Sequence, residues 1–452
     1  MPLPFALALL VWVTLLVSAC NDNKPEATPT TVVEPSATTA TPPATPAPEA
    51  TSTPRPIPSP PAGSRPFPPD LQTEGERILA RVAELRGTPP KAPVKMNLVG
   101  RKAAIDYYRD NFSEESKRQT QLQQDVYQLL GMIPKGANIN ELFLGLLGLG
   151  ILGFYDPDLD AFFLLDDLGG LDSAASRTTI VHELAHALQD QYLDINKIEG
   201  ERRRSNDWDG LTAFLDVIEG DAVATEGAYR NASPRRAACY QIPTVRNVPG
   251  IPYVVQRELN TWYEDGFCFI EAVAGQVSQT GTILENLPVS TEQILHPEKY
   301  QAGEKPVPVT PAPLEQALGQ GWKEAGRANF GEFTLQNLLV LGMRDDRTRV
   351  QRAAAGWGGD GWTLYDREDA HLLHLETAWD SNDDAREFFD TLFESLTSRV
   401  SGGRQPPTSE GGFTLQIDTS TWRASLRDNR VTILVSTDTA ALDLVANQLA
   451  MP

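Results

Sequence analysis

The sequence predicts an α+β protein with a mainly helical domain that carries a small edge sheet, followed by a C-terminal α+β domain of order β-β-α-β-β-α. Three patterns predict this class. Apolar residues recur at helical spacing over residues 178–192 and 211–226. Residues 153–165 are typical of two short strands around an Asp-Pro turn. The C-terminal part alternates between strand-like and helical segments, at 361–365, 371–379, 382–399, 421–437 and 439–449.

The N-terminus predicts export. Residues 3–17 are almost wholly apolar, and small residues precede Cys20 as in a bacterial lipobox. This resemblance implies a signal peptide over 1–19 and a lipidated Cys20 that anchors an extracytoplasmic lipoprotein to the cell membrane. The first residues lack Lys and Arg, and an uncleaved N-terminal anchor is the alternative, although the apolar run is short for a membrane span.

Residues 20–69 are predicted to be a disordered tether, because 15 of the 35 prolines fall there among Thr, Ala and Ser. The remaining chain is long enough for two domains, predicted at 70–305 and 306–452. The oligomeric state is not specified by any pattern.

The charge of the chain limits the classes of partner that it can bind. The chain has 39 Lys and Arg against 60 Asp and Glu, a formal net charge of −21, which argues against nucleic acid and against electrostatic binding to anionic lipid. The chain has three cysteines, and two of them, Cys239 and Cys268, are left once Cys20 is assigned to the lipid anchor. An oxidising compartment would allow these two to pair, and two free buried thiols are the alternative.

The strongest functional pattern is an HExxH motif formed by His182, Glu183 and His186. Residues four apart on a helix lie one above the other, so both imidazoles can bind one Zn²⁺ per chain. Glu183 is placed to take a proton from a zinc-activated water. Asp172 or Ser173 would cap this helix. The alternative is a core helix with two satisfied histidines and a surface glutamate.

A zinc hydrolase needs a third protein ligand. A metzincin would require Gly at position 189 and His at 192, where this chain has Gln189 and Tyr192. Glu219 lies at the edge of an apolar stripe on the next predicted helix, where binding to a metal would satisfy a buried carboxylate. The alternatives are Asp216, Asp221 and Glu226. Three small residues predict that this helix lies close to the HExxH helix, namely Gly220, Ala222 and Ala224.

These two segments resemble the gluzincin-type zinc metallopeptidases in a minimal form, closely over the two helices and loosely over 70–305. The resemblance implies a zincin-like domain that hydrolyses peptide bonds of a protein or peptide substrate, as a metalloendopeptidase. It implies zinc ligands His182, His186 and Glu219 with Glu183 as general base. Thermolysin-like members carry an Asp where this chain has Val223, so the predicted hydrogen-bond partner of a ligand histidine is Asp216, Asp221 or Asp190.

Accessory roles follow from the same chemistry. His296, which precedes a proline in a polar loop, is predicted to stabilise the oxyanion, with Tyr229, Tyr263 and Tyr300 as rival donors. Residues 161–165 are predicted to be an edge strand that holds the substrate backbone, or else an ordinary hairpin strand. The glycine-rich residues 356–361 are predicted to form a turn.

The alternative function is a non-catalytic envelope binding or assembly lipoprotein with a structural zinc site. Glu183 favours the enzyme, because a structural site requires ligands but no base.

Overall fold

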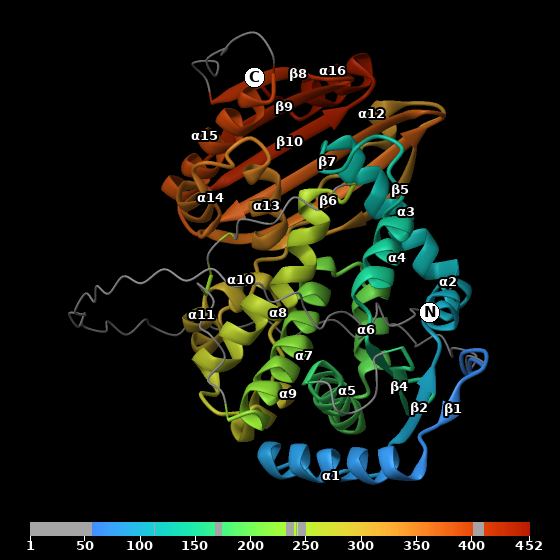
Figure 1. Cartoon of the computed structure of the whole chain (residues 1–452). Coiled ribbons are helices and arrows are strands. Elements are labelled where there is room, and N and C mark those ends of the chain that lie inside the picture. Colours follow the sequence, from blue (N-terminus) through green and yellow to red (C-terminus); the bar gives the residue numbers. More distant parts are fainter. Residues whose placement is uncertain are drawn as a thin grey trace, which may run out of the picture. The chain divides into compact units, whose positions relative to one another are not determined.

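A computed structural model of the chain describes residues 57–112, 114–167, 174–231, 239–240, 242, 250–400 and 411–452 (Figure 1). The predicted α+β class is confirmed: the described residues are 54% helical and form two sheets. The described residues from Pro58 onward belong to one compact unit, and the predicted boundary at residue 306 stays a prediction. Cys20, the signal peptide and the predicted caps Asp172 and Ser173 lie outside the described residues.

The folded part begins before residue 70. Strand β1 (Arg65–Pro66) pairs with β2 (Lys95–Val99), and Phe67 is only 6% exposed in a core with helix α1 (Pro69–Arg86). Pro69 begins α1 because its fixed φ suits the first helical turn, and Gly87 ends it at φ 66°. The end of the predicted tether is therefore ordered structure.

The small sheet has the order β1-β2-β4-β3. Strand β4 (Ala161–Leu165) is parallel to β2 and antiparallel to β3 (Gly153–Asp156). Since β4 has neighbours on both sides, the prediction that it forms the edge is wrong, and β3 forms that edge.

The helices that follow the small sheet's first strands are short and amphipathic. Two of them precede α4, namely α2 (Arg101–Asn111) and α3 (Glu114–Leu129). The apolar residues 140–152 form α4 (Ile139–Gly150), whose cap Asn138 accepts a hydrogen bond from the Glu141 N–H.

Three long helices form the centre of the molecule: α5 (Ala174–Leu193), α7 (Trp208–Tyr229) and α8 (Tyr253–Val273) (Figure 1). The predicted stripe of α5 is buried at Val181, Leu184 and Leu188, whereas Tyr192 is 41% exposed. Short helices complete this part of the chain: α6 (Ile195–Arg204), η1 (Val277–Gln279), α9 (Gly281–Glu285), α10 (Thr291–Leu295) and α11 (Pro297–Ala302).

Helices α7 and α8 cross at two glycines. A Cβ atom added at Gly220 would lie 2.5 Å from the Phe267 nitrogen, and one at Gly266 would lie 2.7 Å from the Asp216 carbonyl carbon. Gly220 was expected to serve the approach to the HExxH helix, but it serves the approach to α8 instead.

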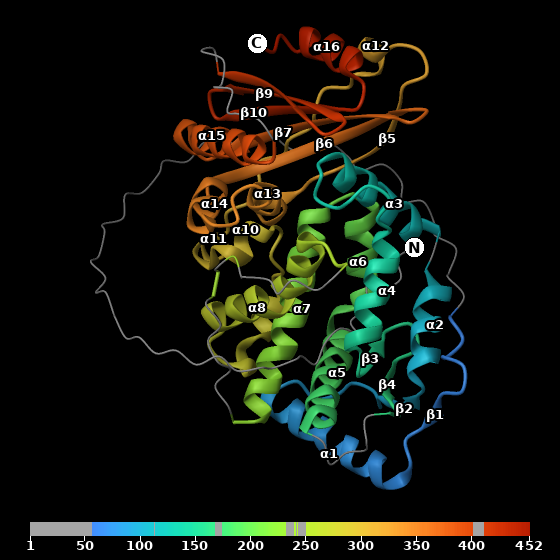
Figure 2. The ribbon, with the colours of Figure 1, turned by 45° about the horizontal axis from the view of Figure 1, so that its top comes forward.

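The C-terminal sheet is antiparallel with the order β5-β6-β7-β10-β9-β8. Its strands are β5 (Lys323–Ala328), β6 (Trp357–Arg367), β7 (Ala370–Trp379), β8 (Gly412–Ile417), β9 (Ser420–Arg427) and β10 (Arg430–Ser436). Figure 2 shows the helices on its two faces, α12 (Glu315–Leu318) and α16 (Thr439–Gln448) on one and α13 (Gly331–Val340), α14 (Arg347–Ala354) and α15 (Asn382–Ser398) on the other. The predicted order β-β-α-β-β-α lacked α12, β5, α13, α14 and β8.

The glycine-rich residues 356–361 were predicted to form a turn, but only Gly356 lies in one, and residues 357–361 begin strand β6. The Val307 N–H donates to the Gly358 carbonyl at 2.7 Å. A Cβ at Gly359 would lie 3.2 Å from the Val307 carbonyl carbon, and one at Gly361 would lie 3.2 Å from that of Val309. The glycines therefore admit the connecting chain against the part of β6 that β5 leaves unpaired.

One hydrophobic core joins the two predicted domains. It combines Val126 of α3 and Val254 of α8 with Trp362 of β6, Leu338 of α13 and Phe388 of α15. The second large core surrounds α7 and the third lies between α1, α5 and the small sheet. In the described part of the chain, no helix is long and apolar enough to cross a membrane.

Candidate metal centre

Helix α5 presents the two histidines of the HExxH motif on one side. The ring centroids of His182 and His186 are 4.6 Å apart and the rings are nearly perpendicular. Both side chains are buried, 6% and 0% exposed, although imidazoles are rarely buried without a partner. The helix therefore holds two nitrogen donors together inside the protein.

Helix α7 brings Glu219 to the same place. Its Oε2 lies 3.1 Å from His182 Nε2 and 3.6 Å from His186 Nε2. All three potential ligand atoms lie within 4.8 Å of one another. The three residues predicted as ligands are thus brought together by two helices that pack side by side and are separated along the chain only by α6.

The spacing fits a zinc ion. Ligands at 2.0–2.2 Å in tetrahedral geometry are about 3.4 Å from each other, which is the scale of the two separations to Glu219. His186 Nε2 has no hydrogen-bond partner among the described residues, and an unsatisfied buried nitrogen is costly unless a ligand uses it. The donor set, two imidazoles and one carboxylate, is one that zinc prefers.

The other nitrogens of both rings are engaged. His182 Nδ1 lies 2.7 Å from Glu226 Oε1, and His186 Nδ1 lies 2.8 Å from Gln189 Oε1. A carboxylate and an amide oxygen only accept, so each ring carries a hydrogen on Nδ1. The Nε2 atom of His186 then keeps its lone pair for the centre, whereas Nε2 of His182 faces the Glu219 carboxylate and would give up its own hydrogen when a metal binds.

These partners correct the prediction that Asp216, Asp221 or Asp190 would hold a ligand histidine. Asp190 instead accepts from the Tyr155 hydroxyl at 2.9 Å. Asp221 contacts Gln189, which in turn contacts His186, so Asp221 does not touch the histidine itself.

Charges at the centre are strongly coupled. Burial disfavours the charged form of His182, but its hydrogen bonds to Glu219 and Glu226 outweigh burial and raise its pKa. Burial would raise the pKa of Glu219, yet the two histidines hold it at about 2. Burial lowers the pKa of His186. In the metal-free protein, a proton on His182 therefore balances the negative charge of Glu219 and Glu226, as a bound metal cation would.

Glu183 lies on the same turn of α5 as His182, and its side chain contacts the edge strand β3. Its Oε2 accepts the backbone N–H of Tyr155 in β3 at 2.8 Å. Burial raises the pKa of Glu183 to about 8, against the opposing effect of His182. A carboxyl group that exchanges a proton near neutral pH suits general acid–base chemistry.

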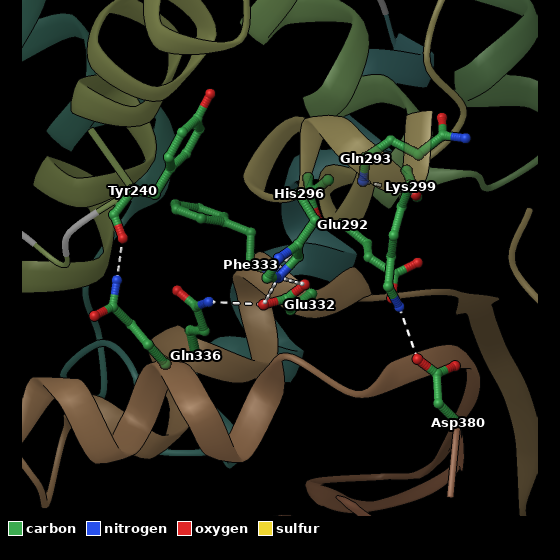
Figure 3. Close-up of polar contacts among 12 residues, drawn as sticks. Tyr240, Glu292, Gln293, His296, Lys299, Glu332, Phe333, Gln336 and Asp380 are labelled. Carbon is green, nitrogen blue, oxygen red and sulfur yellow. Dashed lines mark hydrogen bonds and ion pairs between the residues drawn. The ribbon is translucent and has the colours of Figure 1, made fainter. Parts of the chain in front are cut away.

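His296 lies at the junction of α10 and α11, in a different polar cluster (Figure 3). Its Nε2 is 3.1 Å from the Glu332 carboxylate of α13, to which Gln336 also donates. Its Nδ1 is 3.6 Å from Glu298. The described contacts of His296 do not include the three ligand residues, and its catalytic role stays a prediction.

Among the rival donors, Tyr263 is nearest to the ligands. Its ring centroid is 6.0 Å from that of His182. The Tyr300 hydroxyl donates to the Asn286 carbonyl at 2.7 Å, and Tyr229 packs partly buried against the core of α1 and α5. Tyr263 is therefore better placed than the other two to reach a substrate carbonyl at the centre.

A second group of carboxylates already surrounds a cationic side chain. Glu292, Glu304 and Asp380 converge, but Lys299 Nζ lies 2.5, 2.9 and 2.7 Å from them (Figure 3). The ammonium group occupies the position that a cation would take, so this group functions as an ion-pair cluster.

The two remaining cysteines are joined. Cys239 and Cys268 form a disulfide with Cα atoms 5.6 Å apart, and Cys268 lies on α8 two residues after Gly266. The bond ties the chain that precedes α8 to the helix that packs against α7.

Sequence reasoning missed several residues of the centre. Glu226 was considered only as an alternative ligand, and Gln189 only as a departure from another family's pattern. One signal was available: Gln189 lies three residues after His186, on the same helix face. No local pattern pointed to Tyr155 or Arg86, which come from other elements.

Comparisons with known proteins concern the C-terminal part. A family model described as "Domain of unknown function (DUF8575)" matches residues 316–446. The match runs from α12 into α16, and the residues of the candidate metal centre lie outside it. No curated protein and no solved structure matches the chain.

Proposed function

We propose that the chain is a zinc-dependent peptidase of gluzincin type, with a zincin-like catalytic domain. The observation that carries the proposal is the convergence of His182, His186 and Glu219 at zinc-ligand spacing, with Glu183 one residue away from the first ligand. The nitrogen of His186 that lacks a partner supports a bound metal in particular.

The residues divide the chemistry among them. Zinc held by the three ligands would activate water and polarise the scissile carbonyl. Glu183 takes the proton from that water and delivers it to the leaving amine. Tyr263 donates a hydrogen bond to the carbonyl oxygen as it gains charge, and His296 is the alternative donor from the sequence. Glu226 and Gln189 hold the ligand histidines in the tautomer that binds metal.

The site of action follows from the N-terminus. We propose that Cys20 is lipidated and that the following tether connects the peptidase to the outer side of the cell membrane. The disulfide between Cys239 and Cys268 supports an oxidising compartment, where such bonds persist. The substrate is a protein or peptide in that compartment, and the charge of −21 argues against nucleic acid.

The test combines metal content with hydrolysis. The purified chain should hold about one zinc ion, and His186→Ala should lose it. Glu183→Gln should keep the zinc and lose hydrolysis of unfolded protein by several orders of magnitude, because an amide accepts no proton. Glu292→Gln is the matched control, since Glu292 is also buried with a pKa near 8 but lies in the Lys299 cluster. Full zinc content in His186→Ala would contradict the metal site.

A structural zinc site in a binding lipoprotein is the second candidate. Burial favours it, because His182, Glu183, His186 and Glu219 are each at most 6% exposed and structural zinc sites are closed. A native chain that holds zinc, cleaves nothing across a broad peptide library and is stabilised by zinc would establish this alternative.

A further inference from the structure

Three residues behind His186 form a continuous buried chain from α1 to the candidate metal centre. Arg86, the last residue of α1, lies with its Nη2 2.7 Å from Asp221 Oδ2. The same Asp221 oxygen accepts from Gln189 Nε2 at 2.7 Å, and Gln189 Oε1 faces His186 Nδ1. We propose that Arg86, Asp221 and Gln189 are positioning residues that set the tautomer of His186. This inference rests on the proposed metal centre.

The orientation of the Gln189 amide carries the argument. Its Nε2 lies 2.9 Å from the Ile218 carbonyl oxygen, which can only accept a hydrogen bond, and 2.7 Å from the Asp221 carboxylate. That end of the amide must therefore be the NH₂ group. The oxygen end remains for His186, so His186 carries its hydrogen on Nδ1 and keeps the lone pair of Nε2 for a metal.

Arg86 holds Asp221 in place behind Gln189. It neutralises Asp221 in the protein interior, where both side chains are at most 2% exposed, and its Nη1 donates to Thr225 at 2.9 Å. Without the guanidinium, the Asp221 carboxylate loses the contact that holds it against Gln189 Nε2. The Gln189 amide, and with it the hydrogen bond to His186 Nδ1, is then held less firmly.

The two ligand histidines are thus held by different chemistry. His182 is held by the carboxylate of Glu226. His186 is held by the neutral amide of Gln189, whose orientation is set by its contacts with Ile218 and Asp221. A carboxylate at position 189 would add a further negative charge beside Glu219 and Asp221. The amide sets the tautomer without that charge, and α1 becomes part of the centre although it supplies no ligand.

The test reads the tautomer directly, in the metal-free protein. The chain has only 5 histidines, so ¹⁵N-histidine labelling of the full chain gives few ring signals, and His186→Asn identifies those of His186. The expected native result is a protonated Nδ1 and an unprotonated Nε2. Gln189→Met should produce a mixture of tautomers and weaken zinc binding by about 10–100-fold, as for other residues behind metal ligands.

The other variants separate positioning from folding. Arg86→Met should change the tautomer and weaken zinc binding in the same direction, and Arg86→Lys should restore both because it keeps a cation beside Asp221. Gln336→Met is the matched control: Gln336 is equally buried, contacts Arg257 and Glu332, and should leave the tautomer and zinc affinity unchanged.

Two outcomes overturn the inference. One is a native His186 with its hydrogen on Nε2. The other is a Gln189→Met variant whose tautomer and zinc affinity equal those of the native chain. A native chain that shows the Nδ1 tautomer but binds no zinc contradicts the proposed function instead and leaves the positioning of His186 standing.

Discussion

Replacing Gly220 by alanine tests whether the metal centre depends on the close crossing of α7 and α8. Gly220 follows the predicted ligand Glu219 directly, and the three atoms nearest to an added Cβ are backbone atoms of Gly266 and Phe267 in α8. Backbone atoms cannot rotate away as the end of a long side chain can. The helices must therefore separate at this point, and Glu219 moves with α7.

The size of the effect follows from the distances. The added Cβ would lie 2.5 Å from the Phe267 nitrogen, whereas ordinary contacts begin near 3.4 Å, so the overlap is about 0.9 Å. Overpacking of this kind costs about 1–3 kcal/mol, and two facing backbones place it at the upper end. Alanine is more favourable than glycine inside a helix by about 1 kcal/mol, which offsets part of this cost. We expect Gly220→Ala to lower the free energy of unfolding by about 2 kcal/mol.

Gly145→Ala is the matched control, because Gly145 lies inside α4 with no atom within 4 Å of an added Cβ. It should raise stability by about 0.5–1 kcal/mol. Urea denaturation of the metal-free chains measures the difference between the two variants, expected to be about 3 kcal/mol. Competition with a chelator should show weaker zinc binding only for Gly220→Ala. Equal stability of the two variants would refute the tight crossing.

Three further predictions test other parts of the reasoning. Glu226→Gln should weaken zinc binding by about 10–100-fold, measured by chelator competition, because His182 loses its anionic partner; unchanged affinity would exclude that role. Burial raises the pKa of Glu258 to about 7 while Tyr127 donates to it at 2.5 Å. The folded chain holds this proton more tightly than the unfolded chain, so the stabilisation is complete below about pH 4.5 and disappears as pH rises through about 7. Native stability should fall by about 3 kcal/mol over this window relative to Glu258→Gln, and parallel pH curves would contradict this. Cys20→Ala should block labelling by a fatty-acid analogue, and a variant that is still labelled and processed would exclude the lipobox.

Local patterns predicted the parts of the molecule that depend on local geometry. Residues four apart on a helix share a face wherever the helix lies, so His182 and His186 could be paired without a structure. Glu219 was identified by a chemical requirement, a third ligand on an otherwise apolar face. The alternation of strands and helices likewise indicated the α+β class.

What the sequence could not predict depends on contacts between distant elements. Arg86 and Asp221 are 135 positions apart, and no spacing rule connects them. The position of β4 inside its sheet depends on β2, whose five residues carry no clear strand pattern. Gly220 was correctly interpreted as a site of close approach, but the partner helix was wrong because both α5 and α8 lie beside α7.

The hydrophobic core shared by α3, α8 and the six-stranded sheet has a consequence for the evolution of the sequence. Because Trp362 and Phe388 pack in the same cluster as Val126 and Val254, each predicted domain buries part of its apolar surface against the other. A substitution deep in the C-terminal sheet therefore weakens the scaffold of α8, and through α8 the helix that carries Glu219. Selection on the proposed metal centre would then act on residues far outside it, including residues of the segment that matches the family model.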